Sequence, residues 1–320
     1  MTHTKDTDAI KWAAQVVTFY RPSFWNVDDD QELLDYVAKS PEAFWNRLLD
    51  SVAEAKLDYV EFCFEPGDWK TALKAYGSPE NLVESLASRN LKLSGSYQSG
   101  WDLEKGIVDA SARTEIMENA RRHSEFLAAC GTGIMLSGPT RRGEMEGSIF
   151  PQVSDASLAS TAEIMSEMAE ITRSFGVRLA IHTEAYSCIC REDDIDRVME
   201  MTEPGLVFLC PDSGHIALDG GNPVNVVAKH VARMTSMHWK DCIGERSNLP
   251  ANGSVTHHEM MEQFRRMGKG IVDWTGVVEA MRDQGFTGFA AAEIDLAEDP
   301  IGDTRDIVDY FETKLSKIYR

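Results

Sequence analysis

Short apolar runs alternate along the chain with longer segments in which apolar residues recur three and four positions apart. A short run is typical of a buried strand, and the longer spacing is typical of a helix with one buried face. The predicted strands cover residues 11–18, 57–64, 91–96, 133–137, 177–183, 206–210, 234–239 and 288–294. The predicted helices cover residues 31–56, 111–130, 157–175, 193–201, 224–231, 257–283 and 304–318, with one more that begins after Ser78.

Eight strands alternating with helices predict an α/β fold, a parallel (β/α)8 TIM barrel, in a single domain over residues 1–320. Ser78 and Pro79 have the form of an N-cap and a first helical residue. The segment 257–283 is expected to be mainly helical, with interruptions at Gly268 and Gly270. A doubly wound open sheet is the competing fold, and the lack of a Gly-rich phosphate loop after the first strand weakens it.

The chain is strongly acidic, with 32 Lys and Arg against 52 Asp and Glu and a formal net charge of −20. This balance opposes a nucleic-acid partner, which needs a basic face, but it allows small polar substrates. No apolar run approaches the roughly 20 residues of a membrane span, and the first residues lack the apolar core of a signal peptide. The six cysteines show neither zinc nor disulfide spacing. We therefore predict a cytoplasmic protein with free thiols and no membrane partner.

The last four predicted strands all end in residues that can bind a metal. An apolar strand buries itself, so a carboxylate or an imidazole at its end needs a reason, and a barrel carries its active site at these ends. Three carboxylates and one imidazole favour manganese, with magnesium or cobalt as alternatives, over a closed structural zinc site. Taken singly, each residue also has an ordinary explanation as a cap, a turn residue or a core histidine. The proposed ligands of a single ion are Glu184, Asp212, His238 and Glu293.

Several neighbours of these residues are further candidates. His182 lies two residues before Glu184, on the same side of an extended strand, and is a second candidate for the general base. Lys240 could bind substrate or orient His238, or could form an ordinary strand-end ion pair with Asp241. Trp239 could stack on a sugar near the barrel mouth, and Arg246 could hold a hydroxyl or an anionic group; core packing and a solvated arginine are the alternatives.

Three motifs resemble the sugar phosphate isomerase/epimerase superfamily, with its xylose isomerase-like barrel. They are Asp-Ser-Gly-His at 212–215, Met-His-Trp-Lys-Asp at 237–241, and the closing GKGIVDW…GFTGFAAAEID. The resemblance covers most of residues 90–300, is strongest over 177–295, and is closest to the inosose dehydratase branch. It implies that Glu184, Asp212, His238 and Glu293 are the ligands from strands five to eight and that His215 touches substrate oxygens. Inosose dehydratases show a run of histidines at strand five, whereas Glu184 in this chain resembles the epimerases.

The resemblance implies a metal-dependent enzyme that removes a proton next to the carbonyl of a keto-sugar, keto-glycoside or keto-cyclitol. The expected outcome is β-elimination by a dehydratase or lyase, with epimerisation or aldose–ketose isomerisation as the alternative. Glu184 and Glu293 are the candidate acid and base. An endonuclease IV-like nuclease is disfavoured by the charge and by the eight histidines, and a non-catalytic sugar-binding subunit by the intact ligand set. The sequence leaves open a homo-oligomer or a small partner subunit.

Overall fold

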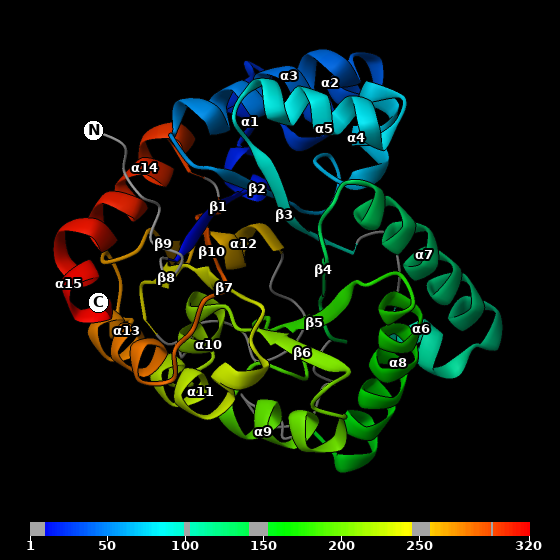
Figure 1. Cartoon of the computed structure of the whole chain (residues 1–320), viewed down its shortest axis with the longest axis vertical. Helices are drawn as coiled ribbons and strands as arrows, with labels where there is room; N and C mark the ends of the chain where they lie inside the picture. The colour runs from blue at the N-terminus through cyan, green and yellow to red at the C-terminus, as the bar shows by residue number, and fades with distance from the viewer. Residues whose placement is uncertain (1–9, 99–102, 141–152, 245–256, 296) are drawn as a thin grey trace.

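Eight parallel strands form the centre of the molecule, which Figure 1 shows almost along the barrel axis. The computed structural model describes residues 10–98, 103–140, 153–244, 257–295 and 297–320. The sheet order is β6-β5-β4-β3-β2-β1-β10-β7, and isolated bridges between Leu209 and Met234 and between Asp212 and His238 join its two edges. The predicted (β/α)8 barrel is therefore confirmed. Its strands are β1 (Lys11–Gln15), β2 (Tyr59–Phe62), β3 (Lys92–Tyr97), β4 (Ile134–Ser137), β5 (Arg178–His182), β6 (Val207–Cys210), β7 (Ser236–Trp239) and β10 (Phe289–Ala292).

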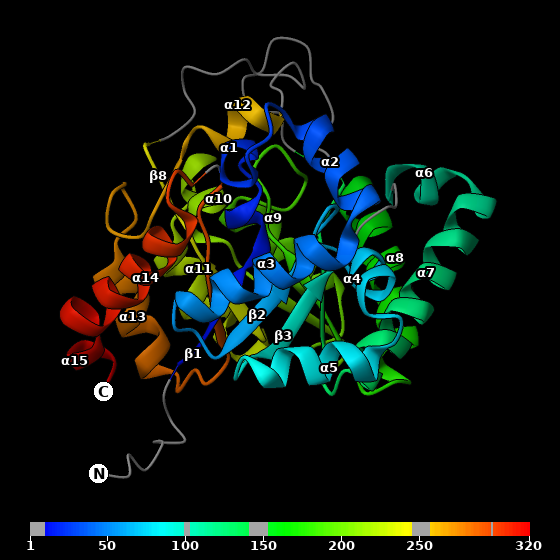
Figure 2. The same ribbon diagram turned by 90° about the horizontal axis from the view of Figure 1, so that it is seen from above.

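Helices surround this sheet on its outer face (Figures 1 and 2). Many of them start at an Asp or Ser side chain that accepts a backbone N–H of the first turn, as Ser78 does from Asn81, with Pro79 the first helical residue. Within the described ranges, no helix has the length and apolar character that a bilayer crossing requires. The longer helices are α2 (Asp30–Lys39), α3 (Pro41–Glu54), α4 (Trp69–Tyr76), α5 (Pro79–Ser88), α7 (Ala110–Ala129), α8 (Asp155–Arg173), α9 (Glu192–Met201), α11 (Pro223–His230), α13 (Trp274–Asp283) and α14 (Pro300–Tyr310); the shorter ones are α1 (Pro22–Trp25), α6 (Leu103–Val108), α10 (Ser213–Leu218), α12 (His257–Met261) and α15 (Ser316–Tyr319).

Two of the predicted helices differ from the structure. The segment predicted as one helix over residues 31–56 is two helices, because Pro41 has no backbone N–H and disfavours helical geometry at Ser40. The segment 257–283 is less helical than predicted. Between α12 and α13 it contains the short strand β9 (Phe264–Arg265), which pairs antiparallel with β8 (Asp241–Cys242).

The strands divide the core into two parts. Side chains alternate between the two sides of a strand, so every second residue faces the barrel interior. The large cluster lies between the sheet and the helices, and it includes Trp45, Phe62 and Trp239. A small cluster of Ile134, Leu136, Ala180 and Cys210 is separate from it. Ala180 lies on the same side of β5 as His182, so the small cluster fills the interior below the carboxyl ends of the strands.

His123 is a buried imidazole away from those strand ends. Its ring stacks on Trp69, with centroids 5.2 Å apart and planes 12° apart, and links α7 to α4. Neither ring nitrogen has a hydrogen-bond partner among the described residues. Burial, with a smaller contribution from Lys70, lowers the pKa of His123 to about 3. The fold therefore holds this side chain neutral, in a setting that suits an apolar ring equally well.

We expect His123→Phe to remove part of the acid sensitivity of the fold. The folded pKa of about 3 lies below the ordinary value of 6.5, so the unfolded chain binds this proton more readily. The stabilising contribution of neutral His123 is complete above pH 6.5 and is lost as the pH falls from 6.5 to 3. Urea denaturation at several pH values would measure it. A wild-type and variant difference that stays constant between pH 7 and pH 4 would contradict this account.

Candidate active site

Three side chains from neighbouring strands converge at the carboxyl end of the barrel. His182 Nε2 lies 3.1 Å from His238 Nδ1 and 3.6 Å from Asp212 Oδ2, and His238 Nδ1 lies 3.8 Å from the same oxygen. We call these three atoms the ligand triangle. All three residues are buried, and Asp212 is completely inaccessible. Two atoms that each bind one ion at about 2.0–2.2 Å are about 3 to 3.6 Å apart, so the triangle is close to the size that a metal ion requires.

The free oxygen of Asp212 supports this interpretation. Its Oδ1 accepts the N–H of His215 and caps α10, whereas its Oδ2 accepts no hydrogen bond among the described residues. Four nitrogens surround Oδ2 at 3.4–3.9 Å, those of His182, His215, His238 and Lys240. These separations are too long for hydrogen bonds. A buried carboxylate oxygen without such bonds is costly, and a cation in the triangle would satisfy it.

Lys240 is the cation that neutralises this end of the barrel in the protein alone. Its side chain is 1% exposed, and its Nζ lies 2.6 Å from Glu293 Oε1 and 2.7 Å from Asp295 Oδ2. The other oxygen of Glu293 is 2.6 Å from His238 Nδ1. Glu293 therefore joins the ligand triangle to Lys240. Its carboxylate can act as a fourth metal ligand by giving up its contact with His238 or with Lys240.

The charged groups of the site shift one another's pKa values toward the ionised forms. Burial disfavours ionised Glu293, but Lys240 and His238 outweigh it and lower the pKa of Glu293 to about 2. Burial is also outweighed at Asp212, whose pKa lies well below the usual range because of Lys240, His215 and His182. The pKa of Lys240 is in turn raised well above its ordinary value, because Asp212, Asp295 and Glu293 outweigh burial. Burial opposes charging of His238, yet Cys210, Glu61 and Glu293 raise its pKa well above the ordinary value.

Each residue of the Asp212–His215 motif has a separate function in this geometry. The Ser213 hydroxyl donates to the carbonyl oxygen of Lys240 at 2.7 Å and ties α10 to the end of β7. Gly214 allows Lys240 to approach, since a Cβ there would lie 2.8 Å from Lys240 Cγ. His215 Nδ1 accepts the N–H of Ala185, so the neutral ring carries its proton on Nε2. Burial and Lys240 lower the pKa of His215 well below its ordinary value, and the ring therefore offers an N–H donor beside Lys240.

Glu184 lies in a different place from the one predicted for it. Its Oε2 accepts a hydrogen bond from the Tyr97 hydroxyl at 3.2 Å, and the position expected for the strand-five ligand is occupied by His182. His182 is the last residue of β5, whereas Glu184 lies two residues beyond the strand, on the side of the cavity formed by β3. Glu184 thus lies outside the ligand triangle, and its carboxylate lines the cavity.

One other predicted residue is not brought to the site. Trp239 is completely buried against Trp12, Trp274 and Phe311, between the sheet and the helices. It lies between His238 and Lys240 in sequence, and alternation turns it to the opposite side of β7. The sugar-stacking interpretation therefore fails, and the core-packing alternative describes its place. Arg246 lies outside the described residues.

Sequence reasoning missed Glu61, Gln15 and Tyr97. Glu61 Oε1 lies 2.7 Å from His238 Nε2 and accepts a hydrogen bond from Gln15 Nε2 at 3.0 Å. A signal for Glu61 was present, because the strand Tyr59–Phe62 carries one carboxylate within an apolar run. Nothing in the sequence distinguished Gln15 or Tyr97 from ordinary polar residues at strand ends.

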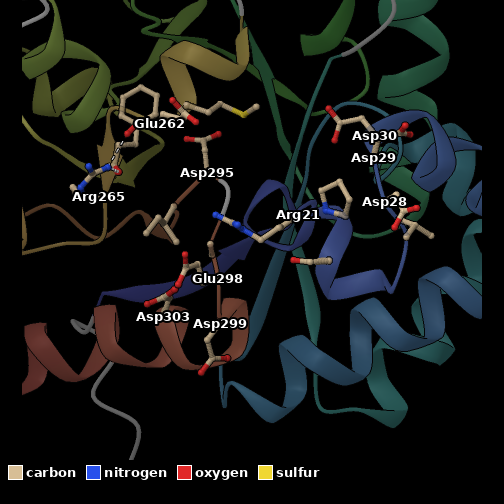
Figure 3. A pocket seen from close by; sticks show the side chains of 17 residues that line it. Arg21, Asp28, Asp29, Asp30, Glu262, Arg265, Asp295, Glu298, Asp299 and Asp303 are labelled. Carbon is tan, nitrogen blue, oxygen red and sulfur yellow. Dashed lines mark hydrogen bonds between the residues drawn. The ribbon is translucent and has the colours of Figure 1, made fainter.

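The site residues surround a cavity of about 320 Å3. Its lining includes Tyr97, Glu184, His215, Lys240 and Glu293, together with apolar atoms of Val17, Phe64 and Met260. A wider pocket of about 1180 Å3 adjoins it and shares Asp295 with it. Figure 3 shows Arg21 pointing into the wider pocket, on the side where Asp295 and Glu298 lie. Its described lining carries eight acidic residues against Arg21 and Arg265, and the acidic ones are Asp28, Asp29, Asp30, Glu262, Asp295, Glu298, Asp299 and Asp303.

Comparison with known proteins agrees with this geometry. The xylose isomerase-like TIM barrel family matches residues 49–314. The chain belongs to this family. The inosose dehydratase of Bacillus licheniformis is 25% identical over 235 residues, which cover 70% of this chain and 75% of that protein. The chain is thus an enzyme of the sugar phosphate isomerase/epimerase type, whose members modify sugars.

Solved structures of this family share the whole fold. The IOLI protein, whose structure carries a bound zinc atom, has a TM-score of 0.68 and 14% identity, covering 97% of this chain and 98% of that one. L-ribulose 3-epimerase has a TM-score of 0.67 and 13% identity, with 97% and 96% coverage. At these identities the comparison establishes the barrel architecture and nothing about the substrate.

Asp241 stabilises the loop that follows the site. Its carboxylate accepts four hydrogen bonds of 2.9–3.0 Å, from the backbone N–H groups of Cys242, Gly268 and Val272 and from the Trp274 indole. A Cβ on Gly270 would lie 2.2 Å from Asp241 Oδ1, so this approach requires glycine. Lys240 pairs with Glu293 and Asp295, whereas Asp241 accepts hydrogen bonds from its own loop. The two residues therefore have different partners, in place of the ion pair suggested between them.

We expect Asp241→Ala to lower the free energy of unfolding by about 3 kcal/mol or more, because several buried donors lose their acceptor at once. Asp273→Ala is the matched control in the same segment. Asp273 is exposed, and its carboxylate accepts the cap hydrogen bond from the N–H of Gly276, so a loss of about 1 kcal/mol is expected. Urea denaturation of both variants measures the difference, and equal losses would show that Asp241 is an ordinary loop residue.

Proposed function

We propose that this protein is a divalent-metal-dependent enzyme that removes a proton next to the carbonyl of a keto-sugar, keto-glycoside or keto-cyclitol and then eliminates a β-substituent. The observation that carries this proposal is the ligand triangle of His182, Asp212 and His238, with Glu293 beside it. The zinc atom of the IOLI protein supports a divalent ion in this fold. The mixed set of two imidazoles and two carboxylates accepts manganese, cobalt or zinc, and manganese remains our prediction.

A bound divalent cation would polarise the substrate carbonyl and its neighbouring hydroxyl, and so would acidify the C–H bond between them. Glu184 is the proposed base, because it faces the cavity outside the ligand triangle and is held there by Tyr97. His215 offers its Nε2–H and Lys240 its ammonium to substrate oxygens, since their nitrogens lie 3.3 Å apart at one wall of the cavity. Lys240 is the proposed proton donor to the leaving group.

The pocket chemistry favours an uncharged substrate. Carboxylates dominate the described lining of the wider pocket, and three of them face the single ammonium of Lys240 in the small cavity. The small cavity, of about 320 Å3, suits a single six-membered ring. A phosphate would meet Glu184, Glu293 and Asp295 in the small cavity, where Lys240 is already neutralised. The wider pocket beside Asp295 offers space for a leaving group larger than water. These features support a keto-cyclitol or keto-glycoside over a sugar phosphate.

Epimerisation is the second candidate, favoured by one observation. Glu184 and Glu293 come from β5 and β10 and both line the cavity, so two carboxylates can reach a substrate ring from different sides. Proton removal by one and return by the other would invert a carbon centre. The same site chemistry serves both outcomes, and only the products distinguish them.

The decisive measurement is solvent deuterium exchange by the metal-free and manganese-loaded protein with keto-inositols, 3-keto-glucosides and ketohexoses. We expect exchange only with metal, accompanied by loss of water or of an aglycone. Glu184→Gln should retain the metal and lower the exchange rate by about 10²- to 10⁴-fold, the usual contribution of a general base. Glu203→Gln, a change at an exposed residue, is the control and should exchange normally. Exchange at the wild-type rate in Glu184→Gln would remove Glu184 from this role.

We also expect Lys240→Met to lower the free energy of unfolding of the metal-free protein more than that of the metal-loaded protein. Removal of Lys240 takes away the ammonium that contacts the buried carboxylates of Asp212, Glu293 and Asp295, which costs about 3–5 kcal/mol. A metal that binds only the folded state restores part of this loss. The rise in Tm on metal addition should therefore be larger in the variant.

Lys229→Met is the control for this comparison. Lys229 pairs with Asp196 at 2.7 Å on the surface and is 52% exposed, so its removal should change the free energy of unfolding by less than about 1 kcal/mol. If metal-free Lys240→Met proved as stable as wild type, Lys240 would not be the neutralising cation of the site.

A further inference from the structure

We propose that Glu61 is a positioning residue for the metal, which holds the Nε2 proton of His238 so that Nδ1 faces the ligand triangle. This inference rests on the proposed function. Glu61 lies on β2 and His238 on β7, which are separated in the sheet by β1 and β10. Their side chains nevertheless meet inside the barrel, with Oε1 and Nε2 2.7 Å apart. Both residues are 1% exposed, so no solvent competes for this contact.

The direction of this hydrogen bond follows from Gln15. The side-chain oxygen of Gln15 accepts the backbone N–H of Val17 at 3.2 Å, which fixes the orientation of the amide. Its NH2 group must then face Glu61, and it donates to Oε1 at 3.0 Å. Glu61 Oε1 is therefore an acceptor on both sides, and His238 Nε2 must be the donor. Three strands thus contribute to one chain of hydrogen bonds that ends at His238.

The consequence for His238 lies at its other nitrogen. With the Nε2 proton held by Glu61, Nδ1 is the atom that remains for a metal, and it points to His182 Nε2 at 3.1 Å and Asp212 Oδ2 at 3.8 Å. A flip of the ring would break the Glu61 contact and turn carbon toward the triangle. A carboxylate on the far nitrogen of a ligand histidine also makes the ligating nitrogen a better donor to the metal.

Glu61 does not belong to the ligand triangle itself, because it contacts His238 at Nε2, whereas His182 and Asp212 lie at Nδ1. A simple core role would explain its burial, but it would not explain why its acceptor oxygen is shared between Gln15 and His238. The two roles predict different results. Removal of a core hydrogen bond lowers stability alone, whereas removal of the His238 anchor also weakens metal binding.

The test compares Glu61→Leu, Glu61→Gln and wild type in the full-length protein, by titration of manganese with calorimetry or electron paramagnetic resonance. We expect Glu61→Leu to lower manganese affinity about 10- to 100-fold, the usual effect of losing such a partner. Glu61→Gln keeps an acceptor oxygen of the same shape, and its loss should be clearly smaller. Nitrogen NMR of His238 in the metal-free protein should show a protonated Nε2 in wild type and an altered signal in Glu61→Leu.

Ser94→Ala is the matched control. Ser94 lies on β3, is 1% exposed, and donates to the carbonyl oxygen of Val60, the residue before Glu61. It should lose stability without losing manganese affinity. Unchanged affinity in Glu61→Leu, or equal losses in the Leu and Gln variants, would overturn the inference. If wild type itself bound no metal, the proposed function would fail, and the NMR signal of Nε2 would still decide whether Glu61 orients His238.

Discussion

The buried ion-pair network at the carboxyl end of the barrel is the constraint on which this site depends. Three carboxylates, those of Asp212, Glu293 and Asp295, lie within 3.4 Å of a single ammonium that is almost inaccessible to water. Such a group of charges is stable only when it is balanced, because each unpaired ion would cost several kcal/mol in the interior. The unsatisfied oxygen of Asp212 shows that the balance by Lys240 is incomplete. The site is therefore prepared to accept additional positive charge.

A second layer of hydrogen bonds keeps these charged groups in place. Asp212 caps α10, Ser213 ties that helix to β7, and Glu61 anchors His238 from within the barrel. Asp241, on the other side of the same chain segment, organises the loop from Gly268 to Trp274. Consecutive residues of β7 and of the segment that follows it thus point alternately to the two sides of the sheet. A change in one of them is expected to affect either the chemistry or the fold, according to the side it faces.

The end of β5 supplies one side chain to the ligand triangle and another to the cavity wall. His182 occupies the strand-five place in the ligand triangle, and the carboxylate of Glu184 is displaced by two residues onto Tyr97. The carboxylate of Glu184 therefore lies beside the cavity and outside the ligand triangle. The described lining of the wider pocket beside Asp295 is mainly acidic, which supports the proposed preference for an uncharged substrate.

The sequence by itself determined the barrel, because hydrophobic periodicity and helix caps are local properties that the folded chain retains. It also placed Asp212, His238 and Glu293 at the carboxyl ends of strands, since side chains that can bind a metal are conspicuous at the ends of buried runs. It could not distinguish His182 from Glu184, which lie two residues apart on the same side of the chain. The height of each side chain in the barrel depends on the register between neighbouring strands, such as His182 with Cys210 and His238 with Ala291. Only the tertiary structure sets that register, and it alone brought Glu61 from β2 to His238 across 177 residues of sequence.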